Sequence, residues 1–227
     1  MILSLHVPKA AGNSLREMLH REYGERFMGD YGDWSGFDTP AANARRAVRT
    51  AAMRARAAEL QEKYDVIHGH FHADKYTGLF EREDFVAFFR DPYQQAMAHY
   101  FFLLRNPQRD HPEERQFFEE RMTLLDYLSW DAFRNQQSQY LGSVPLEDFT
   151  LVGLSSQFAR GLALYGAIFG RNLGTQRYAN VNVHRQNPEY EISPAVRKAV
   201  EKYRGGDLDL YRRAQEIFEM QARKAGL

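Results

Sequence analysis

Short apolar runs alternate with amphipathic stretches along this chain. Four runs predict buried strands, at the N-terminus and around residues 64–71, 85–89 and 149–153. Stretches with apolar residues on one helical face predict helices at residues 15–23, 41–63, 93–105, 113–140 and 158–169. Such a succession of strands and helices is typical of an α/β fold, and we expect a single domain over residues 1–227.

Polar residues and glycine mark where the predicted helices begin and end. Ser14, Ser155 and Asp207 are placed to cap helices at their N-termini, and Ser193 followed by proline opens a further helix. Gly170 is placed to end the helix before it. Within residues 113–140, the side chains expected in the core are Phe117, Phe118, Met122, Leu125, Leu128 and Phe133.

Three polar segments separate these elements. Residues 29–36 predict a glycine-rich loop. Residues 135–142 form a polar run that either lines the binding site of a substrate or caps a helix. Residues 171–192 predict a long, basic loop, of a length that is often functional in a compact domain. The alternative for this last segment is a disordered connection.

The composition narrows the class of protein. The chain has 227 residues, of which 44% are hydrophobic, and its 30 basic residues balance 30 acidic ones. Because a general nucleic-acid binder shows a basic excess, this balance argues against one. The absence of cysteine excludes disulfides and thiolate metal sites. No apolar stretch approaches a membrane span and the first strand begins at residue 2, so we expect a cytoplasmic protein.

The segment between the first strand and the first helix carries the clearest chemistry. Pro8 ends the strand, and Ala10, Ala11 and Gly12 are small enough for the backbone to approach a ligand closely. Loop N–H groups and a helix N-terminus together favour an anion, and Lys9 adds a positive charge. The order is not that of a Walker A loop, because the lysine precedes the glycine. The alternative is an ordinary strand–helix turn with an incidental lysine.

Histidines follow the second predicted strand. His68 and His70 lie at its carboxyl end, which is the edge where open α/β sheets bind ligands. Since imidazole titrates near neutral pH, either one is a candidate general base. With His72 the run also allows a zinc site, although no acidic partner stands at a fixed spacing. A purely structural pair is the remaining alternative.

Arginines form two groups. Arg90 follows the strand at residues 85–89 and so reaches the same edge, where a guanidinium is suited to a phosphate. The alternative is an ion pair with Asp91 or another carboxylate. A second group lies on the predicted helix at residues 41–63, where a solvated helix face is favoured over a wall that attracts an anionic acceptor.

The order and spacing of these segments resemble the PAPS-dependent sulfotransferases. The resemblance is strongest to the carbohydrate type of that family, which includes heparan sulfate 2-O-sulfotransferase and bacterial relatives. It runs through most of the chain. The segments that carry it are Pro8–Ser14, His68–His70, Arg90–Pro92, His99–Tyr100, Phe102–Arg105, Asn135–Gln136, Leu151–Gly153, Asn180–Asn182 with Arg185, and Asp209–Tyr211 with Phe218.

The resemblance implies a P-loop-kinase-like central parallel sheet flanked by helices, with helical additions. It also implies PAPS as co-substrate, no metal ion, and a hydroxyl acceptor on a carbohydrate or glycolipid. The phosphosulfate is expected over Lys9, Ala10, Ala11, Gly12, Asn13 and Ser14. Lys9 would stabilise the departing phosphate, His70 would be the catalytic base with His68 beside it, and Arg90 would bind the 3′-phosphate. Arg185 would close over the adenosine.

The chain departs from the family pattern at two places. Gln95 and Ala98 stand where the family has arginine and serine, and the serine donates to the 3′-phosphate. Losing that hydrogen bond to a charged group removes roughly 1.5–3 kcal/mol. Residues 154–157 also lack the carboxylate common there. These departures keep open a degenerate relative that binds a nucleotide or glycan without turnover. A nucleotide kinase, with Asp91 on magnesium, is a further alternative.

Overall fold

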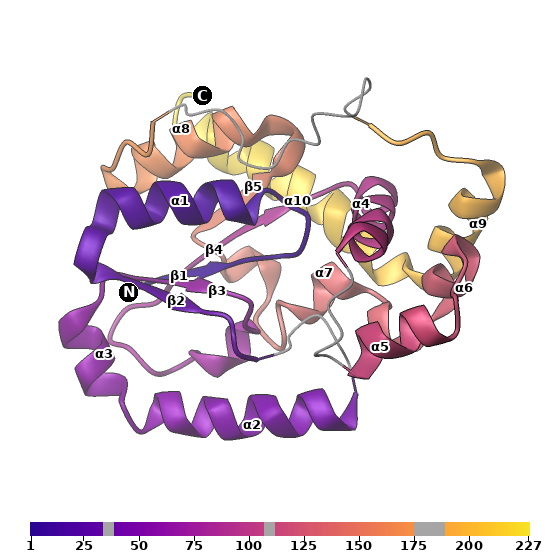
Figure 1. Cartoon of the computed structure of the whole chain (residues 1–227). Coiled ribbons are helices and arrows are strands. Elements are labelled where there is room, and N and C mark those ends of the chain that lie inside the picture. Colours follow the sequence, from indigo (N-terminus) through magenta and orange to yellow (C-terminus); the bar gives the residue numbers. More distant parts are fainter. Residues whose placement is uncertain (34–38, 107–111, 175–188) are drawn as a thin grey trace.

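The chain folds around a five-stranded, all-parallel sheet with the strand order β2-β3-β1-β4-β5. The structure is a computed structural model and describes residues 1–33, 39–106, 112–174 and 189–227. Helices flank the sheet (Figure 1), and the predicted α/β architecture is therefore confirmed. The strands are β1 (Ile2–Leu5), β2 (Phe27–Asp30), β3 (Val66–Gly69), β4 (Asp84–Phe89) and β5 (Leu151–Leu154).

The central strands are apolar because both of their faces are covered. In β1, Leu3 pairs with Ile67 of β3 on one side and with Phe85 of β4 on the other. Such strands are nearly continuous hydrophobic runs, which is why the sequence predicts them. The edge strand β2 was not predicted, because Phe27 and Met28 are only partly buried and its second half falls in the supposed loop at residues 29–36.

The helices account for most of the remaining described residues. They are α1 (Gly12–Tyr23), α2 (Pro40–Arg54), α3 (Ala57–Lys63), α4 (Pro92–Arg105), α5 (Pro112–Glu119), α6 (Leu124–Ser129), α7 (Gln136–Gln139), α8 (Phe158–Phe169), α9 (Pro194–Tyr203) and α10 (Gly205–Lys224). In Figure 1, α1 and α8 lie on one side of the strands, and α2 and α3 lie on the other. Helix α10 packs against β5.

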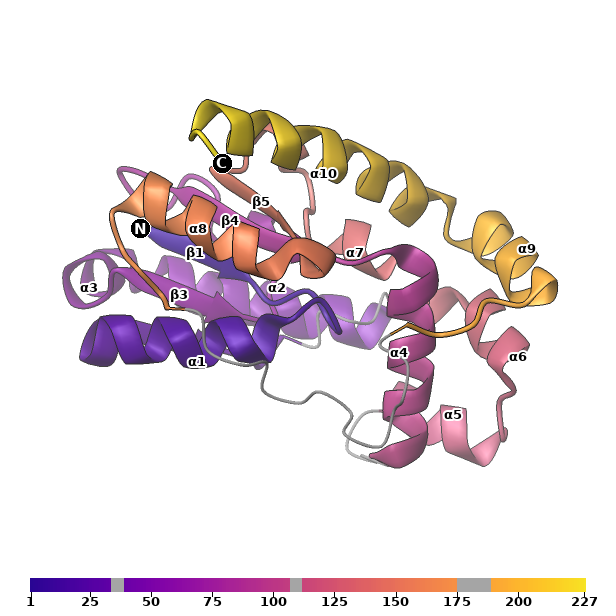
Figure 2. The ribbon, with the colours of Figure 1, turned by 90° about the horizontal axis from the view of Figure 1, so that it is seen from above.

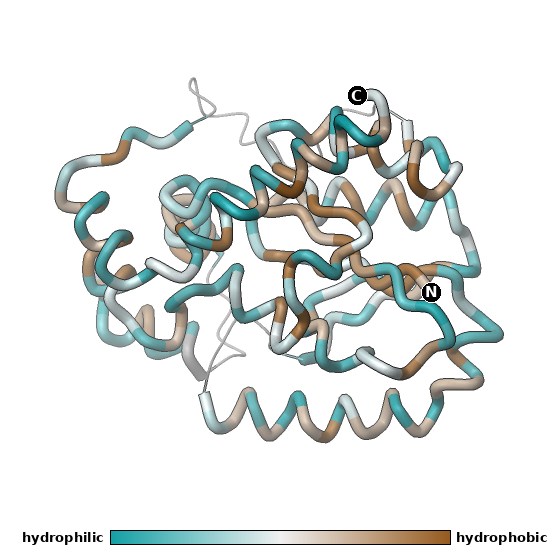
Figure 3. Tube along the Cα trace, turned by 180° about the vertical axis from the view of Figure 1, so that it is seen from behind, coloured by the Kyte–Doolittle hydropathy of each residue, from teal (hydrophilic) through white to brown (hydrophobic). Residues whose placement is uncertain are grey.

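A second group of helices lies beyond the carboxyl ends of the strands. Figures 1 and 2 both place α4, α5, α6, α7 and α9 there, at the opposite end of the sheet from α3. Of these, α4, α5, α6 and α9 contribute to a hydrophobic cluster around Tyr127, Phe133 and Val200, separate from the core of the sheet. In Figure 3, hydrophobic positions gather in the middle of the molecule, and the long helix along the bottom, α2, has many hydrophilic positions. The expected helical additions therefore border the edge of the sheet that the sequence marks for ligands.

Two predicted helices are broken in the structure. Residues 41–63 form α2 and α3, with a break at Ala55 and Arg56. Residues 113–140 form three short helices and a 3-10 turn, and much of this segment packs with α4 and α9 around the second hydrophobic cluster. Phe117, Leu128 and Phe133 are buried as predicted, and Phe118 and Met122 are partly buried. Leu125 is 46% exposed, so its assignment to the core was wrong.

The predicted caps had mixed outcomes. Ser193 caps α9 by accepting from the Val196 N–H, and Gly170 ends α8 with a φ of 65°. Ser14 is not an N-cap, because the left-handed Ala11 starts α1 three residues earlier. Ser155 begins a 3-10 turn that precedes α8, whose N-cap is Gln157. Asp207 lies inside α10, and its carboxylate caps α7 instead.

Candidate functional site

The loop between β1 and α1 has the backbone of an anion cradle. Lys9 and Ala11 adopt left-handed conformations, with φ of 63° and 71°, and α1 starts directly afterwards. The first N–H groups of a helix have no partner within the helix, and no side chain of the N-cap residue caps α1. Gly12 is required by packing, since a Cβ there would lie 1.9 Å from Cδ2 of His6. The loop therefore directs backbone donors to the carboxyl edge of the sheet.

Lys9 lies in a positively charged environment. Its Nζ is 4.1 Å from the centroid of the Phe102 ring. Burial, together with the nearby charges of Arg105 and Arg90, lowers the pKa of Lys9 to about 8. Within the described part of the chain, Lys9 makes no ion pair with a carboxylate. A bound anion would relieve this repulsion, so the position favours an anionic ligand.

Arg90 lies beside this loop, as predicted. Its Nη1 donates to the main-chain oxygen of Lys9 over 3.2 Å. Its own main chain is held by the buried side chain of Gln137, which accepts from the Arg90 N–H and donates to the Arg90 carbonyl. The neighbouring Asp91 accepts from the Gln94 N–H and caps α4. The structure thus brings Lys9 and Arg90 together, from loops that are about 80 residues apart in sequence.

Three histidine rings stack at the same edge. The His6 ring lies 4.2 Å from that of His70 and 5.2 Å from that of His68, measured between centroids. His68 belongs to β3 and is fully buried, with its Nδ1 2.9 Å from the Ser4 hydroxyl of the neighbouring strand β1. It has no surface that a substrate can touch. Burial and the charge of His70 lower the pKa of His68 to about 3, so its ring is neutral.

His70 is the partly exposed member of this stack. Its Nδ1 lies 2.6 Å from the main-chain oxygen of His6 and 3.1 Å from the Tyr140 hydroxyl. Its ring also meets the Tyr31 ring edge to face, with centroids 5.2 Å apart. Burial, with a smaller contribution from the charge of Arg16, lowers the pKa of His70 to about 4. The imidazole is therefore neutral at physiological pH and able to accept a proton.

Four residues near His70 were not assigned a role from the sequence. His6 supplies the carbonyl that orients His70, Tyr140 contacts the same nitrogen, and the Tyr31 hydroxyl lies 3.1 Å from Nδ1 of His6. The guanidinium of Arg16, on α1, lies 5.8 Å from the centroid of the Tyr31 ring. No motif marks Tyr31 or Tyr140, because they come from a loop and from the end of a short helix. Arg16 has a positional signal, since it lies one turn after Gly12.

Gln95 and Ala98, in the segment expected to hold the 3′-phosphate, both lie on α4. Gln95 is buried on α4, and its Nε2 donates to the Pro8 carbonyl over 3.3 Å and to Gln136 over 2.7 Å. Ala98 lies three residues later on the same helix and is 5% exposed. It offers no polar atom of its own side chain. Arg185, which was expected to close over the adenosine, lies outside the described residues.

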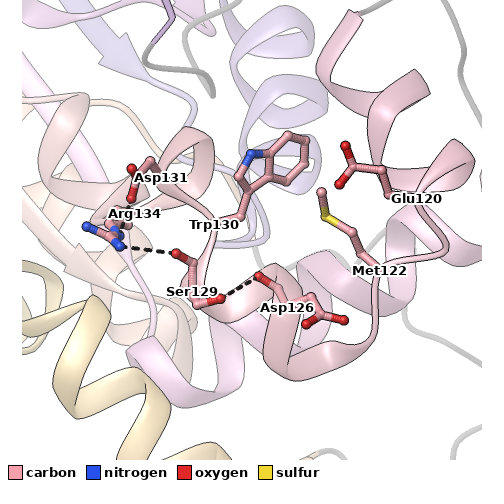
Figure 4. Close-up of a pocket in the computed structure, with 7 residues that line it drawn as sticks. All are labelled: Glu120, Met122, Asp126, Ser129, Trp130, Asp131 and Arg134. Carbon is pink, nitrogen blue, oxygen red and sulfur yellow. Dashed lines mark hydrogen bonds and ion pairs between the residues drawn. The ribbon is translucent and has the colours of Figure 1, made fainter.

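Two open grooves lie elsewhere. One, of about 400 Å³, runs between α5, α6 and the following turn and is lined by Met122, Trp130 and several polar residues (Figure 4). Within it, Arg134 pairs with Asp131 and donates to the Ser129 carbonyl. The other, of about 560 Å³, lies against α3. Neither groove is lined by Lys9, His70 or Arg90, so neither belongs to the candidate site.

The described residues offer neither a cluster of metal ligands nor a membrane-spanning helix. No group of three or more histidine and acidic side chains there is arranged to hold a metal ion. No helix in the same residues combines the length and the apolar character that crossing a membrane requires.

Comparisons with known proteins show a similarity to a solved structure. No family model matches the chain, and no curated protein matches it. Among solved structures, the chain is similar to the crystal structure of a sulfotransferase from Alicyclobacillus acidocaldarius, with 14% identity and a TM-score of 0.46. The match covers 96% of this chain and 95% of that one. The activity named there is that protein's.

Proposed function

We propose that this chain is a sulfotransferase that moves a sulfuryl group from PAPS to a hydroxyl acceptor, on a carbohydrate or glycolipid. The observation that carries the proposal is the charge around Lys9. This ammonium lies beside Arg90 and Arg105 without a carboxylate partner among the described residues, at the uncapped start of α1. The arrangement fits a ligand with several negative charges, and PAPS is proposed as that ligand because the sequence resembles the sulfotransferases.

The residues at the carboxyl edge of the sheet would each have a separate role in an in-line transfer of the sulfuryl group. PAPS, when bound, supplies the sulfuryl group and an anionic leaving group. The loop from Lys9 to Ser14 would hold the phosphosulfate, with Ala10, Ala11, Gly12 and Asn13 contributing backbone. Lys9 would stabilise the charge that grows on the leaving oxygen, and Arg90 would bind the 3′-phosphate. Positioning and charge stabilisation of this kind are the main sources of rate in such transfers.

His70 is proposed as the general base. Its Nδ1 faces the His6 carbonyl, so the other nitrogen, Nε2, carries the lone pair that accepts the proton of the acceptor hydroxyl. His68, with no exposed surface, is assigned to packing beneath His70 rather than to contact with substrate. Ala98 and Arg185 keep their proposed places near the nucleotide.

The two alternatives differ in their support. For a kinase, Asp91 would have to hold magnesium, whereas its carboxylate already caps α4. For a degenerate binder, Gln95 and Ala98 remain the argument, because neither supplies the charge or hydroxyl of the family pattern. A binder would recognise the same nucleotide without turnover.

The test is thermal stability with PAP, the desulfated product, compared with AMP and ADP at equal concentration. A ligand at 100 times its dissociation constant stabilises the folded state by roughly 2.7 kcal/mol, which gives a clear shift in Tm. We expect PAP to give the largest shift, followed by sulfate transfer in an acceptor screen. Equal shifts with all three nucleotides would remove the proposal, and magnesium-dependent ATP turnover would replace it with the kinase.

A further inference from the structure

A three-residue stretch, Asn135-Gln136-Gln137, links the separate segments of the candidate site. It stands at the start of α7, a helix of only four residues that would not be stable by itself. Each of its side chains bonds to a different part of the chain, at Asp207, Gln95 and Arg90. The stretch therefore holds positions that no single strand or helix brings together.

The contact with Arg90 is the most specific of the three. Nε2 of Gln137 donates to the Arg90 carbonyl over 2.8 Å, and Oε1 accepts from the Arg90 N–H over 2.9 Å. Gln137 is fully buried. A side-chain amide that pairs in both directions with one residue's main chain fixes that residue's position, because both bonds require the same plane. The Gln137 side chain thus pairs with the main chain of Arg90 at the end of β4, in the way that a neighbouring strand would.

Gln137 is itself held from α10. The carboxylate of Asp207 accepts from the Gln137 N–H over 3.2 Å, and from the N–H and the hydroxyl of Ser138 over 2.8 and 2.7 Å. Asp207 is fully buried, and its own N–H donates to Asn135 over 3.1 Å. A buried carboxylate with these bonds is costly to move, so Asp207 holds the main chain of Gln137 in place.

We propose that Gln137 is a positioning residue that orients Arg90 for the 3′-phosphate of the nucleotide. The inference rests on the proposed function, and it assigns a role to a side chain that itself touches no substrate. A residue that acts in this way affects how well PAP is distinguished from AMP, because only PAP carries the 3′-phosphate. A residue needed only for folding lowers affinity for both nucleotides together, or lowers stability alone.

The variant Gln137→Glu tests this role with almost no change in shape. It keeps an oxygen for the Arg90 N–H but replaces the donor with a carboxylate oxygen that faces the Arg90 carbonyl. We expect the ratio of the AMP to the PAP dissociation constant, measured by titration calorimetry at pH 7.5, to fall about tenfold. The affinity for AMP should stay within about twofold of the wild-type value.

Gln139→Glu is the matched control. It makes the same change two residues later, where Nε2 bonds to the Arg134 carbonyl and not to Arg90. We expect this variant to keep the wild-type ratio. A second check uses pH, because a buried carboxyl is protonated in mild acid and then donates again. At pH 5.5 the ratio of the Gln137→Glu variant should recover toward that of the wild type at the same pH.

The outcomes are distinguishable. A folded Gln137→Glu variant that keeps the wild-type ratio, or that loses PAP and AMP affinity in the same proportion, overturns the positioning role and leaves the proposed function standing. A wild-type protein without preference for PAP overturns both. If the Glu variant does not fold, Asp207→Asn weakens the cap of α7 instead; a reduced ratio then supports the proposal, and an unchanged ratio overturns it.

Discussion

Nδ1 of His70 lies 2.6 Å from the main-chain oxygen of His6. A carbonyl oxygen only accepts hydrogen bonds, so Nδ1 carries the proton and the neutral ring has its lone pair on Nε2. The Tyr140 hydroxyl, 3.1 Å from the same nitrogen, is then an acceptor as well. One backbone carbonyl thus sets the tautomer that a general base needs.

Replacing this base should remove turnover and leave binding. For His70→Gln we expect kcat to fall by about 10²- to 10⁴-fold, because general-base catalysis contributes that much. The dissociation constant of PAP should change little, since the nucleotide is proposed to lie on the loop and on Arg90. Sulfate transfer to an identified acceptor, measured with titration of PAP, checks both.

His72→Gln is the control for that substitution. His72 is two residues further on, and its ring packs against Tyr140 with centroids 5.6 Å apart. It should retain most of the activity. Wild-type kcat in the His70 variant would contradict the assignment of the base, whatever the outcome with His72.

The dependence of kcat/KM on pH should be bell-shaped with widely separated limbs. The pKa of His70 is lowered to about 4, so activity should be lost only as pH falls through about 4, when the ring becomes charged. The pKa of Lys9 is lowered to about 8, so activity should decline as pH rises through about 8 and its charge is lost. In Lys9→Arg the alkaline limb should move well above pH 8, because a guanidinium stays charged. An acid limb near 6.5 would contradict the buried environment of His70.

The acid limb has to be separated from unfolding. Burial also lowers the pKa of His68 and of His99 to about 3. Below the unfolded value near 6.5 the unfolded chain therefore binds more protons than the folded one, so stability falls as pH falls from about 6.5 toward 3. Each such group contributes up to about 1.4 kcal/mol per pH unit in that window. Circular dichroism at each assay pH shows where the protein is still folded.

The central sheet could be predicted because its physics is local. The runs that form β1, β4 and β5 are apolar on both faces, and a buried parallel strand needs nothing else. The edge strand β2 was missed for the opposite reason, since Phe27 and Met28 are only partly buried and half of the strand lies in a glycine-rich stretch. The helices between residues 112 and 139 were predicted as one because the apolar period does not show where a chain turns back on itself.

The candidate site could be predicted only for residues that lie at or soon after the end of a strand. His70 and Arg90 directly follow β3 and β4, and Lys9 lies in the loop after β1, so the strands place all three at one edge. The role of Asp207 was wrong because its partner α7 is about 70 residues away in sequence, and no local pattern reports such a contact. Gln137 was part of a polar run that fitted either a substrate-binding or a capping role. The proposed positioning role became visible only from its two bonds to the main chain of Arg90.

The missing serine of the family pattern suggests a gain-of-function test. Ala98 lies one turn after Gln95 on α4, and Gln95 faces the Pro8 carbonyl, so both point toward the β1 loop. In Ala98→Ser a hydroxyl would be available to the 3′-phosphate, and PAP affinity should rise about tenfold or more, since such a bond is worth roughly 1.5–3 kcal/mol. AMP affinity should not change. Equal gains for PAP and AMP would place residue 98 away from the 3′-phosphate.

A buried ion cluster behind the site should be essential for stability. Nζ of Lys75 lies 2.5 Å from a carboxylate oxygen of Asp30 and 2.7 Å from both oxygens of Asp33, and all three side chains are almost fully buried. Lys75→Met would leave two buried carboxylates facing each other. Because breaking a buried pair costs about 3–5 kcal/mol, the urea midpoint should fall strongly.

A triple variant separates the charge from the shape of this cluster. Asp30→Asn and Asp33→Asn added to Lys75→Met remove all three charges, and much of the lost stability should return, since uncharged groups of similar size are easier to bury. Asp30 and Asp33 flank Tyr31, whose hydroxyl bonds to His6. Single variants of the cluster should therefore also slow sulfate transfer, because they would disturb Tyr31 and with it the stacked histidines. A Lys75→Met protein with wild-type stability would show that Arg49, which pairs with both carboxylates, is a sufficient partner.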